Sequence, residues 1–311
     1  MSVAIRILAC VALATSLPAP AEVPSQAATA AAPKPDVRVQ QVRPDLSVLT
    51  SVAGNVAVWT GPSGVVLVDD GSANLAPQLL DAVGRLSGQP IRFVVNTHWH
   101  PDHTGGNEAL ARAGAIIVAH ESVRERMLQP QQVFEDYSTK VPAAAPAALP
   151  VVTFSNTMAI ELDGERIGVV HVADAHTDSD VVVRWQEDNV VHMGDVFWNG
   201  SYPFIDLASG GSLAGIVAAL EGVLARIDAQ TVVIPGHGAV GTRAELAAYR
   251  DMLVAVGRHV REAVEAGASV DEVIESHPTA PFDDRYAKGA MSPERFIRTV
   301  YRDLSSPRSG R

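Results

Sequence analysis

The chain has 311 residues, of which 24 are Lys or Arg and 35 are Asp or Glu, so its formal net charge is −11. Hydrophobic residues make up 47% and charged residues 19%, which is typical of a globular protein with a substantial core. This composition excludes disordered, collagen-like and coiled-coil chains. An acidic balance without a block of Lys and Arg also argues against a nucleic-acid partner, because nothing would neutralise the phosphates.

The first residues have the three parts of a secretory signal peptide. Arg6 precedes an apolar run from Ile7 to Leu17, and Ala19-Pro20-Ala21 offers a small-residue cleavage site. The run is too short to span a bilayer, which needs about 20 apolar residues. We therefore expect residues 1–21 to be a signal peptide and the Ala- and Pro-rich residues 22–35 to be a flexible linker. The mature protein is then predicted to be periplasmic or secreted, without membrane contact after cleavage.

The only cysteine, Cys10, lies inside this predicted signal peptide. The mature chain would therefore have neither a disulfide nor a thiolate for catalysis or zinc binding. No shift in composition marks an internal boundary, so we expect residues 36–311 to form one domain.

Short strands and helices alternate along the first half of this domain. Strands are predicted at Val37–Val42, Ser47–Val52, Val56–Thr60, Val65–Val68, Ile91–Val95 and Ala115–Ala119, and helices at Leu75–Leu86, Asn107–Ala113 and Glu121–Leu128. Residues 129–150 contain four prolines and no periodicity, which predicts a long loop.

The second half repeats the alternation. Strands are predicted at Met158–Leu162, Arg166–Val172, Asp180–Trp185, Val190–Met193 and Thr231–Ile234. Helices are predicted from the N-cap Ser212 through the apolar stripe ending at Ile227, from the capping box Thr242-x-x-Glu245 to Val264, and near Val270–Glu275 and Pro293–Leu304. Strands with helices outside each half predict an α/β fold with helix, sheet, sheet and helix layers.

A dense histidine string follows the predicted strand at Ile91–Val95. It reads His98-Trp99-His100-Pro101-Asp102-His103. Neutral imidazole and carboxylate are natural ligands of Zn²⁺, and a strand end holds them on rigid backbone. His98 and His100 point the same way if the segment stays extended, whereas Pro101 lets Asp102 and His103 turn toward a neighbouring point. Two adjacent ligand sets are what a dinuclear hydrolytic site requires.

Three further candidate ligands follow later predicted strands. His176 comes after the strand at Arg166–Val172, Asp195 ends the strand at Val190–Met193, and His237 follows Pro235-Gly236. A lone His or Asp at a strand end is more often an ordinary loop residue. In this order after the histidine string, however, they form a strong pattern.

This pattern resembles the metallo-β-lactamase superfamily, whose first motif is matched by Asp69; the resemblance covers roughly residues 37–253. It implies a four-layer αβ/βα sandwich with two Zn²⁺ per chain at one edge. It assigns His98, His100 and His176 to the first metal, Asp102, His103 and His237 to the second, and Asp195 to a bridge between them. Asp69 would orient ligands without binding metal.

Together with the predicted signal peptide, the resemblance implies an exported hydrolase of a small molecule, cleaving an amide, lactam or ester bond with a metal-bridging hydroxide. Asp102 would serve as both ligand and proton acceptor. Export makes a β-lactam one candidate substrate. The oligomeric state stays open.

Three alternatives remain. One is a thioester hydrolase of the glyoxalase II type, favoured by Asp195 where many β-lactamases have Cys, although the tail after Leu253 has no obvious basic cluster. Another is a mononuclear-iron persulfide dioxygenase using His98, His176 and Asp195, which would leave the second ligand set unused. The last is a metal-binding protein without catalysis.

An aromatic cluster follows Asp195 in an irregular segment. Trp198, Tyr202 and Phe204 are candidates for the floor of a hydrophobic substrate pocket, with plain packing as the equal alternative.

Overall fold

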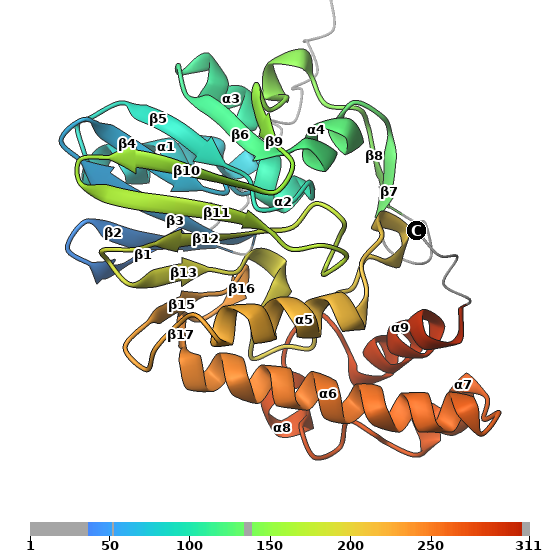
Figure 1. The fold of residues 1–311 in the computed structure, drawn as a ribbon. Helices are drawn as coiled ribbons and strands as arrows, with labels where there is room; N and C mark the ends of the chain where they lie inside the picture. The colour runs from blue at the N-terminus through green and yellow to red at the C-terminus, as the bar shows by residue number, and fades with distance from the viewer. Residues whose placement is uncertain (1–36, 52, 134–138, 307–311) are drawn as a thin grey trace, which may run out of the picture. The chain divides into compact units, whose positions relative to one another are not determined.

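Two β-sheets lie face to face in the domain that follows residue 36 (Figure 1). The computed structural model describes residues 37–51, 53–133 and 139–306, so the predicted signal peptide and linker lie outside the described residues. Within the described ranges one sheet has seven strands and the other six, and helices cover the outer face of each. The predicted α/β four-layer sandwich is confirmed.

The first sheet has the strand order β1-β2-β3-β4-β5-β6-β9. The neighbours from β1 to β4 are antiparallel, and those from β4 to β9 are parallel. Helices α1 and α3 follow β4 and β5, and they pack on the outer face of this sheet. The bounds are β1 Arg38–Arg43, β2 Leu46–Ser51, β3 Gly54–Gly61, β4 Gly64–Val68, β5 Ile91–Val95, β6 Ile116–His120, β9 Val152–Phe154, α1 Ala76–Leu86 and α3 Asn107–Arg112.

The second sheet has the order β10-β11-β12-β13-β15-β17, in which β13 and β15 are parallel. Its outer face packs against α5 and α6, and α9 packs on α6. The bounds are β10 Thr157–Leu162, β11 Glu165–His171, β12 Val181–Trp185, β13 Val190–His192, β15 Val232–Ile234, β17 Gly241–Thr242, α4 Glu121–Met127, α5 Leu213–Leu224, α6 Arg243–Glu265, α7 Val270–Glu275, α8 Asp283–Tyr286 and α9 Pro293–Ser305.

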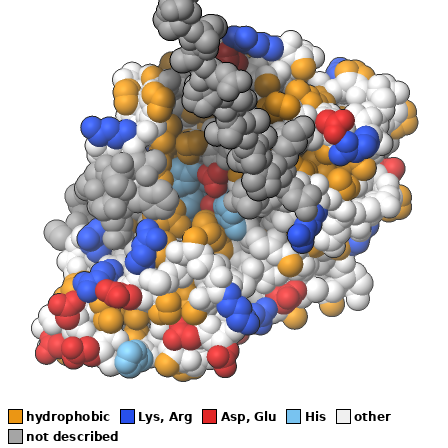
Figure 2. All heavy atoms as spheres, turned by 180° about the vertical axis from the view of Figure 1, so that it is seen from behind, with side chains coloured by type: hydrophobic (Ala, Val, Ile, Leu, Met, Phe, Trp, Pro, Cys, Tyr) orange, Lys and Arg blue, Asp and Glu red, His pale blue; other side chains and the backbone are white. Residues whose placement is uncertain are grey.

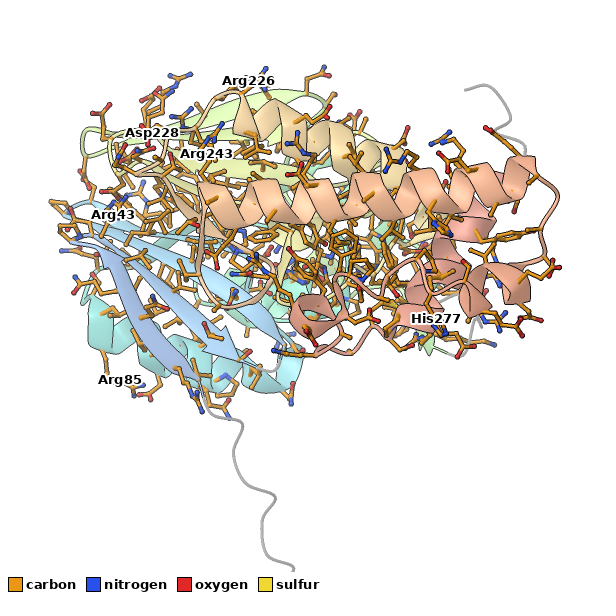
Figure 3. The ribbon with its side chains drawn as sticks, turned by 90° about the horizontal axis from the view of Figure 1, so that it is seen from below. Arg43, Arg85, Arg226, Asp228, Arg243 and His277 are labelled. Atoms are coloured by element: carbon orange, nitrogen blue, oxygen red, sulfur yellow. The ribbon has the colours of Figure 1, made fainter. Side chains whose placement is uncertain are left out.

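Alternation along β12 shows how the sequence builds two cores from one strand. Val181, Val183 and Trp185 point into the core between the sheets, whereas Val182 joins the core under the outer helices. The predicted Thr242–Glu245 capping box is present at the start of α6. Arg243 also donates to the Leu224 carbonyl at the carboxyl end of α5, 3.2 Å away, so it ties the two helices together (Figure 3).

Two predicted boundaries are wrong. The segment predicted as a long loop contains the antiparallel pair β7 (Gln131–Val133) and β8 (Thr139–Val141), and a 3₁₀ turn, η2 (Pro146–Ala148). Three-residue strands are too short for an alternating pattern, and the prolines flank them. Helix α5 ends at Leu224, so Ile227 packs from the following turn.

The carboxyl ends of β4, β5, β11, β13 and β15 meet at one edge of the two sheets. The sheets are joined there by a 2.8 Å hydrogen bond from the Val181 amide to the Thr97 carbonyl. Short elements continue the chain at this edge: α2 Pro101–Thr104, η3 Gly194–Val196, β14 Trp198–Asn199, η4 Leu207–Ser209 and β16 His237–Gly238. Across the described part of the chain, we find no helix with the length and apolar character needed to cross a membrane.

Candidate metal centre

Three histidine side chains and one carboxylate form a buried group at this edge. His100 Nδ1 lies 3.1 Å from His98 Nε2 and 2.9 Å from His176 Nε2. Asp195 Oδ2 lies 3.6 Å from His176 Nε2 and 3.9 Å from His98 Nε2. Four donor atoms, one from each residue, lie within 4.8 Å of one another, which is the spacing of ligands around a single metal ion.

The outer nitrogens of these imidazoles fix their tautomers. His100 Nε2 donates to Asp206 Oδ2 at 3.0 Å, and His176 Nδ1 donates to the Phe204 carbonyl at 2.7 Å. His98 Nδ1 lies 3.0 Å from Thr97 Oγ1, whose own proton goes to Asp69. Each ring therefore turns a nitrogen lone pair toward the other two, as metal-binding histidines do.

Asp102, His103 and His237 form a second group beside the first. His237 Nε2 lies 3.4 Å from both Asp102 Oδ2 and His103 Nε2. Asp195 reaches this group as well, because its Oδ1 is 3.2 Å from His103 Nε2 and its Oδ2 is 3.4 Å from His237 Nε2. One carboxylate thus contacts both groups, the position predicted for a bridging ligand.

The two groups differ in their access to solvent. The side chains of the first group are at most 5% exposed, whereas Asp102 is 37% and His237 is 20% exposed. Figure 2 shows histidine and acidic side chains together in a hollow on this face. The second group is therefore the side from which a substrate can approach.

Burial and neighbouring charges act in opposite directions on these groups. Burial lowers the pKa of His98 well below its usual value and that of His176 to about 4. Burial would also lower the pKa of His103 and His237, but carboxylates outweigh it, Asp195 first. They raise the pKa of His103 well above its usual value and that of His237 to about 9. The pKa of Asp195 is well below its usual range because His237 and His103 outweigh its burial.

A divalent metal fits both groups. Three lone pairs that face one another across 2.9 and 3.1 Å repel unless a cation lies between them. In the second group the negative field that holds protons on His103 and His237 would equally hold a cation. Imidazole and carboxylate donors without thiolate suit Zn²⁺, and imidazole also suits iron.

Asp69 contacts His103 and belongs to neither ligand group. Its Oδ2 accepts from His103 Nδ1 and Thr97 Oγ1, both at 2.8 Å, and its Oδ1 accepts from the Thr97 amide at 2.7 Å. This is the position expected for a residue that orients a ligand. Asp69 also has a φ of 63°, a conformation that Asp and Asn adopt more readily than other residues with a side chain.

Asp69→Asn is expected to reduce kcat/KM and metal affinity about 10- to 100-fold. The amide keeps the backbone conformation but loses one acceptor, so His103 and Thr97 cannot both be satisfied. Metal titration and steady-state kinetics measure the effect. Asp163→Asn is the control, because Asp163 has a positive φ of 50° but lies on the surface. Equal behaviour of the two variants would contradict the orienting role.

The histidine string does not continue the strand. β5 ends at Val95, and Thr97 to Trp99 form a bend before α2. The prediction that His98 and His100 converge because the segment stays extended is therefore wrong in its reason. They converge because the backbone turns around the site.

Asp206 is a residue of this site that the sequence did not reveal. It is 2% exposed and holds His100 from a position 106 residues further along the chain. Its local sequence, Phe204-Ile205-Asp206-Leu207, has no motif. Only the folded arrangement identifies it.

A cavity of about 260 Å³ opens beside the second group. Of the three predicted aromatic residues, Trp198 and Phe204 line it. Tyr202 does not: it is fully buried, stacks on Phe296 at 4.9 Å and donates to Asp283 Oδ1 at 2.7 Å. Of the two roles predicted for Tyr202, pocket floor and packing, the structure shows packing. The lining residues that the sequence did not indicate are Val133, Val141, Ala290, Met291 and Arg295.

Comparison with known proteins places this site in a family. The sequence profile of the metallo-beta-lactamase superfamily matches residues 49–237. The chain is 30% identical to a hydroxyacylglutathione hydrolase from Anaeromyxobacter dehalogenans (strain 2CP-C) over 172 residues, 55% of this chain and 56% of that protein. It is 23% identical to metallo-beta-lactamase type 2 from Bacillus cereus over 204 residues, 65% of this chain and 74% of that protein.

A solved structure shares the fold. Metallo-beta-lactamase from Pontibacter korlensis aligns with a TM-score of 0.59 at 22% identity, covering 70% of this chain and 99% of that one. The chain spans little more than half the length of the hydroxyacylglutathione hydrolase that it matches. The matched region runs past Asp69 and both ligand groups to His237. The chain therefore belongs to the metallo-β-lactamase superfamily.

Proposed function

We propose that this protein is a metal-dependent hydrolase that binds two Zn²⁺ per chain and cleaves an amide, lactam or ester bond of a small molecule. The observation that carries the proposal is the position of Asp195. Its carboxylate lies within 3.4 Å of His237 and 3.6 Å of His176, so two ligand groups share one anionic residue. Side-by-side ligand groups of this kind are characteristic of dinuclear hydrolytic sites.

The side chains around the site have separate roles in this reaction. A metal bound there supplies Lewis acidity, which polarises a carbonyl and makes water nucleophilic near neutral pH. Asp102 is the more exposed carboxylate of the site, at 37% against 3% for Asp195, and accepts the proton of the attacking water. Asp206 and Asp69 keep His100 and His103 in their tautomers.

The cavity suits a substrate with an apolar body and an anionic group. Val133, Val141 and Met291 form apolar walls that exclude water from the reacting bond. Arg295, at the start of α9, brings a positive charge to the same cavity. A β-lactam carries a carboxylate next to the strained amide bond that the site would cleave. It is therefore our first candidate substrate.

Export of the protein is part of the same proposal. The support is the signal-peptide pattern of residues 1–21, with Arg6 before the apolar run. A periplasmic or secreted location would bring the site into contact with such antibiotics.

A thioester hydrolase is the second candidate. The protein from Anaeromyxobacter dehalogenans to which the chain is 30% identical is named a hydroxyacylglutathione hydrolase. The presence of Asp195, where many β-lactamases have a cysteine, also fits this alternative. The persulfide dioxygenase alternative is less well supported, because it gives no role to Asp102, His103 and His237, which lie together here.

Metal analysis separates hydrolase from oxygenase. We expect about two zinc ions per chain in purified protein and about one in His103→Ala, which lacks a donor of the second group. Elemental analysis by mass spectrometry measures both. One iron per chain, or unchanged zinc content in His103→Ala, would overturn the dinuclear assignment.

A substrate panel separates the hydrolase candidates. Zinc-loaded protein is given a chromogenic cephalosporin, a lactone, a neutral aryl ester and an S-acylglutathione. The proposal predicts the highest kcat/KM on the cephalosporin. Preference for the S-acylglutathione would replace it with the thioester hydrolase.

Arg295→Gln is expected to raise KM for the anionic cephalosporin about tenfold, which corresponds to about 1.4 kcal/mol. Glutamine keeps most of the length and polarity but removes the charge. The neutral aryl ester is the matched control, and its KM should change little. Steady-state kinetics on both substrates measure the difference, and an equal change in KM would show that Arg295 does not recognise charge.

A further inference from the structure

A second and larger cavity lies on the outer face of the second sheet, away from the metal centre. Its volume is about 610 Å³, within the range of small-molecule sites. It is bounded by β11, β12 and β13 on one side and α5 on the other (Figure 1). It shares no lining residue with the cavity beside the second ligand group.

The cavity exists because α5 covers only part of this sheet. Val182 and Val191 form its buried floor, at 6% and 1% exposure. Val170, one strand further out, is 45% exposed. On the helix side Gly215 cannot be larger, because a Cβ there would lie 1.9 Å from the Asp174 carbonyl oxygen. The apolar floor and exposed wall together make a slot that an aliphatic chain would fill.

The charged side chains at this cavity, Arg184 and Arg226, are both positive. No Asp or Glu is among the described lining residues, although the whole chain has a net charge of −11. Arg184 Nη1 donates to the Arg226 carbonyl at 2.9 Å, which fixes the guanidinium. Figure 3 shows Arg226 at the outer surface, beside the second sheet.

Arg184 and Arg226 both line the cavity, so two guanidinium groups stand beside its apolar floor. A carboxylate is the acceptor that a guanidinium binds most strongly. The apolar slot therefore has a cationic end.

We propose that this cavity binds the carboxylate of a single-chain aliphatic acid, separately from the metal centre. The alkyl chain lies along Val170, Val182 and Val191. The carboxylate accepts hydrogen bonds from Arg184, with Arg226 adding positive charge.

Calorimetric titration of the zinc-loaded full chain with sodium dodecanoate, below its micelle concentration, tests the proposal. We expect saturable binding of one dodecanoate per chain. Each methylene added between decanoate and dodecanoate should tighten binding about three- to fourfold. Dodecanol and dodecyltrimethylammonium should bind at least tenfold more weakly. Equal binding of the neutral alcohol, or no binding of dodecanoate, would overturn the proposal.

Variants locate the binding site. Arg184→Gln is expected to weaken dodecanoate binding at least tenfold, whereas Arg295→Gln, a loss of charge at the other cavity, should leave it unchanged. The reverse result would place the acid in the cavity beside the metal centre and overturn the assignment.

A second pair keeps the test valid if Arg184→Gln does not fold. Val170→Glu places a negative charge in the slot and should abolish binding, whereas Val170→Lys, of similar length, should retain it. Val170 is 45% exposed, so folding should survive in both variants. Equal binding by the two variants would show that charge in this slot is irrelevant and would contradict the proposal.

Discussion

Asp195→Asn is expected to lower kcat/KM on the order of 10³-fold, about 4 kcal/mol of transition-state stabilisation. It is also expected to lower the zinc content from about two ions per chain to one or fewer. The reason is that the carboxylate contacts both ligand groups, with its two oxygens 3.2 Å from His103 and 3.4 Å from His237. An amide has the same shape but one acceptor oxygen and no charge, so it cannot bridge two cations.

The measurements are elemental analysis and steady-state kinetics on the same preparation. Asp251→Asn is the control, because this carboxylate is 68% exposed and pairs only with surface Arg250 in the described contacts. A variant at Asp195 that retained two zinc ions and at least a tenth of the activity would contradict the bridging role.

The candidate ligands could be located from the sequence because each follows a strand that the sequence shows clearly. The apolar run at Ile91–Val95 precedes the histidine string, and the parallel pair β13 and β15 brings Asp195 and His237 to the same edge. Strand ends therefore determine the ligand positions, although the local backbone differs, since the segment before α2 bends and does not extend.

The hydrogen-bond partners that hold these side chains in place were not predictable, because they come from segments far apart in the sequence. Asp206 reaches His100 across 106 residues, and Asn55 Nδ2 donates to the Pro235 and Gly238 carbonyls, both at 2.9 Å, across about 180 residues. A single sequence contains no local signal for such pairs.

The substrate cavity shows the same limit. An aromatic residue after Asp195 is equally suited to a pocket and to a core, and the fold separates them. The Trp198 ring lies beside His237, with 4.2 Å between ring centroids, whereas Tyr202 packs under α9. Val133 and Met291 reach the cavity from segments far from the motif. The two candidate ligand groups could therefore be predicted from the sequence, but the lining of the cavity beside them could not.

Gly236→Ala is expected to reduce activity and metal content at least 100-fold and to destabilise the fold by about 2–4 kcal/mol. A Cβ at Gly236 would lie 2.0 Å from Asp195 Oδ1 and 2.7 Å from the Gly194 carbonyl carbon. Gly236 is not among the positive-φ residues, so the problem is space and not backbone conformation. Its amide donates to the Gly194 carbonyl at 2.7 Å, which holds the loop before His237 against the turn that carries Asp195.

Gly84→Ala is the matched control, because Gly84 lies in α1 and no atom comes within 4 Å of a Cβ built there. It should stabilise the protein by about 0.5–1 kcal/mol, since alanine is the better helix former. Thermal unfolding and zinc titration on both variants separate the two effects. If Gly236→Ala bound zinc as the unmodified protein does, the loop before His237 and the Asp195 carboxylate could move apart without loss of zinc binding. The close approach of Gly236 to Asp195 would then not be what positions His237 beside the bridging residue.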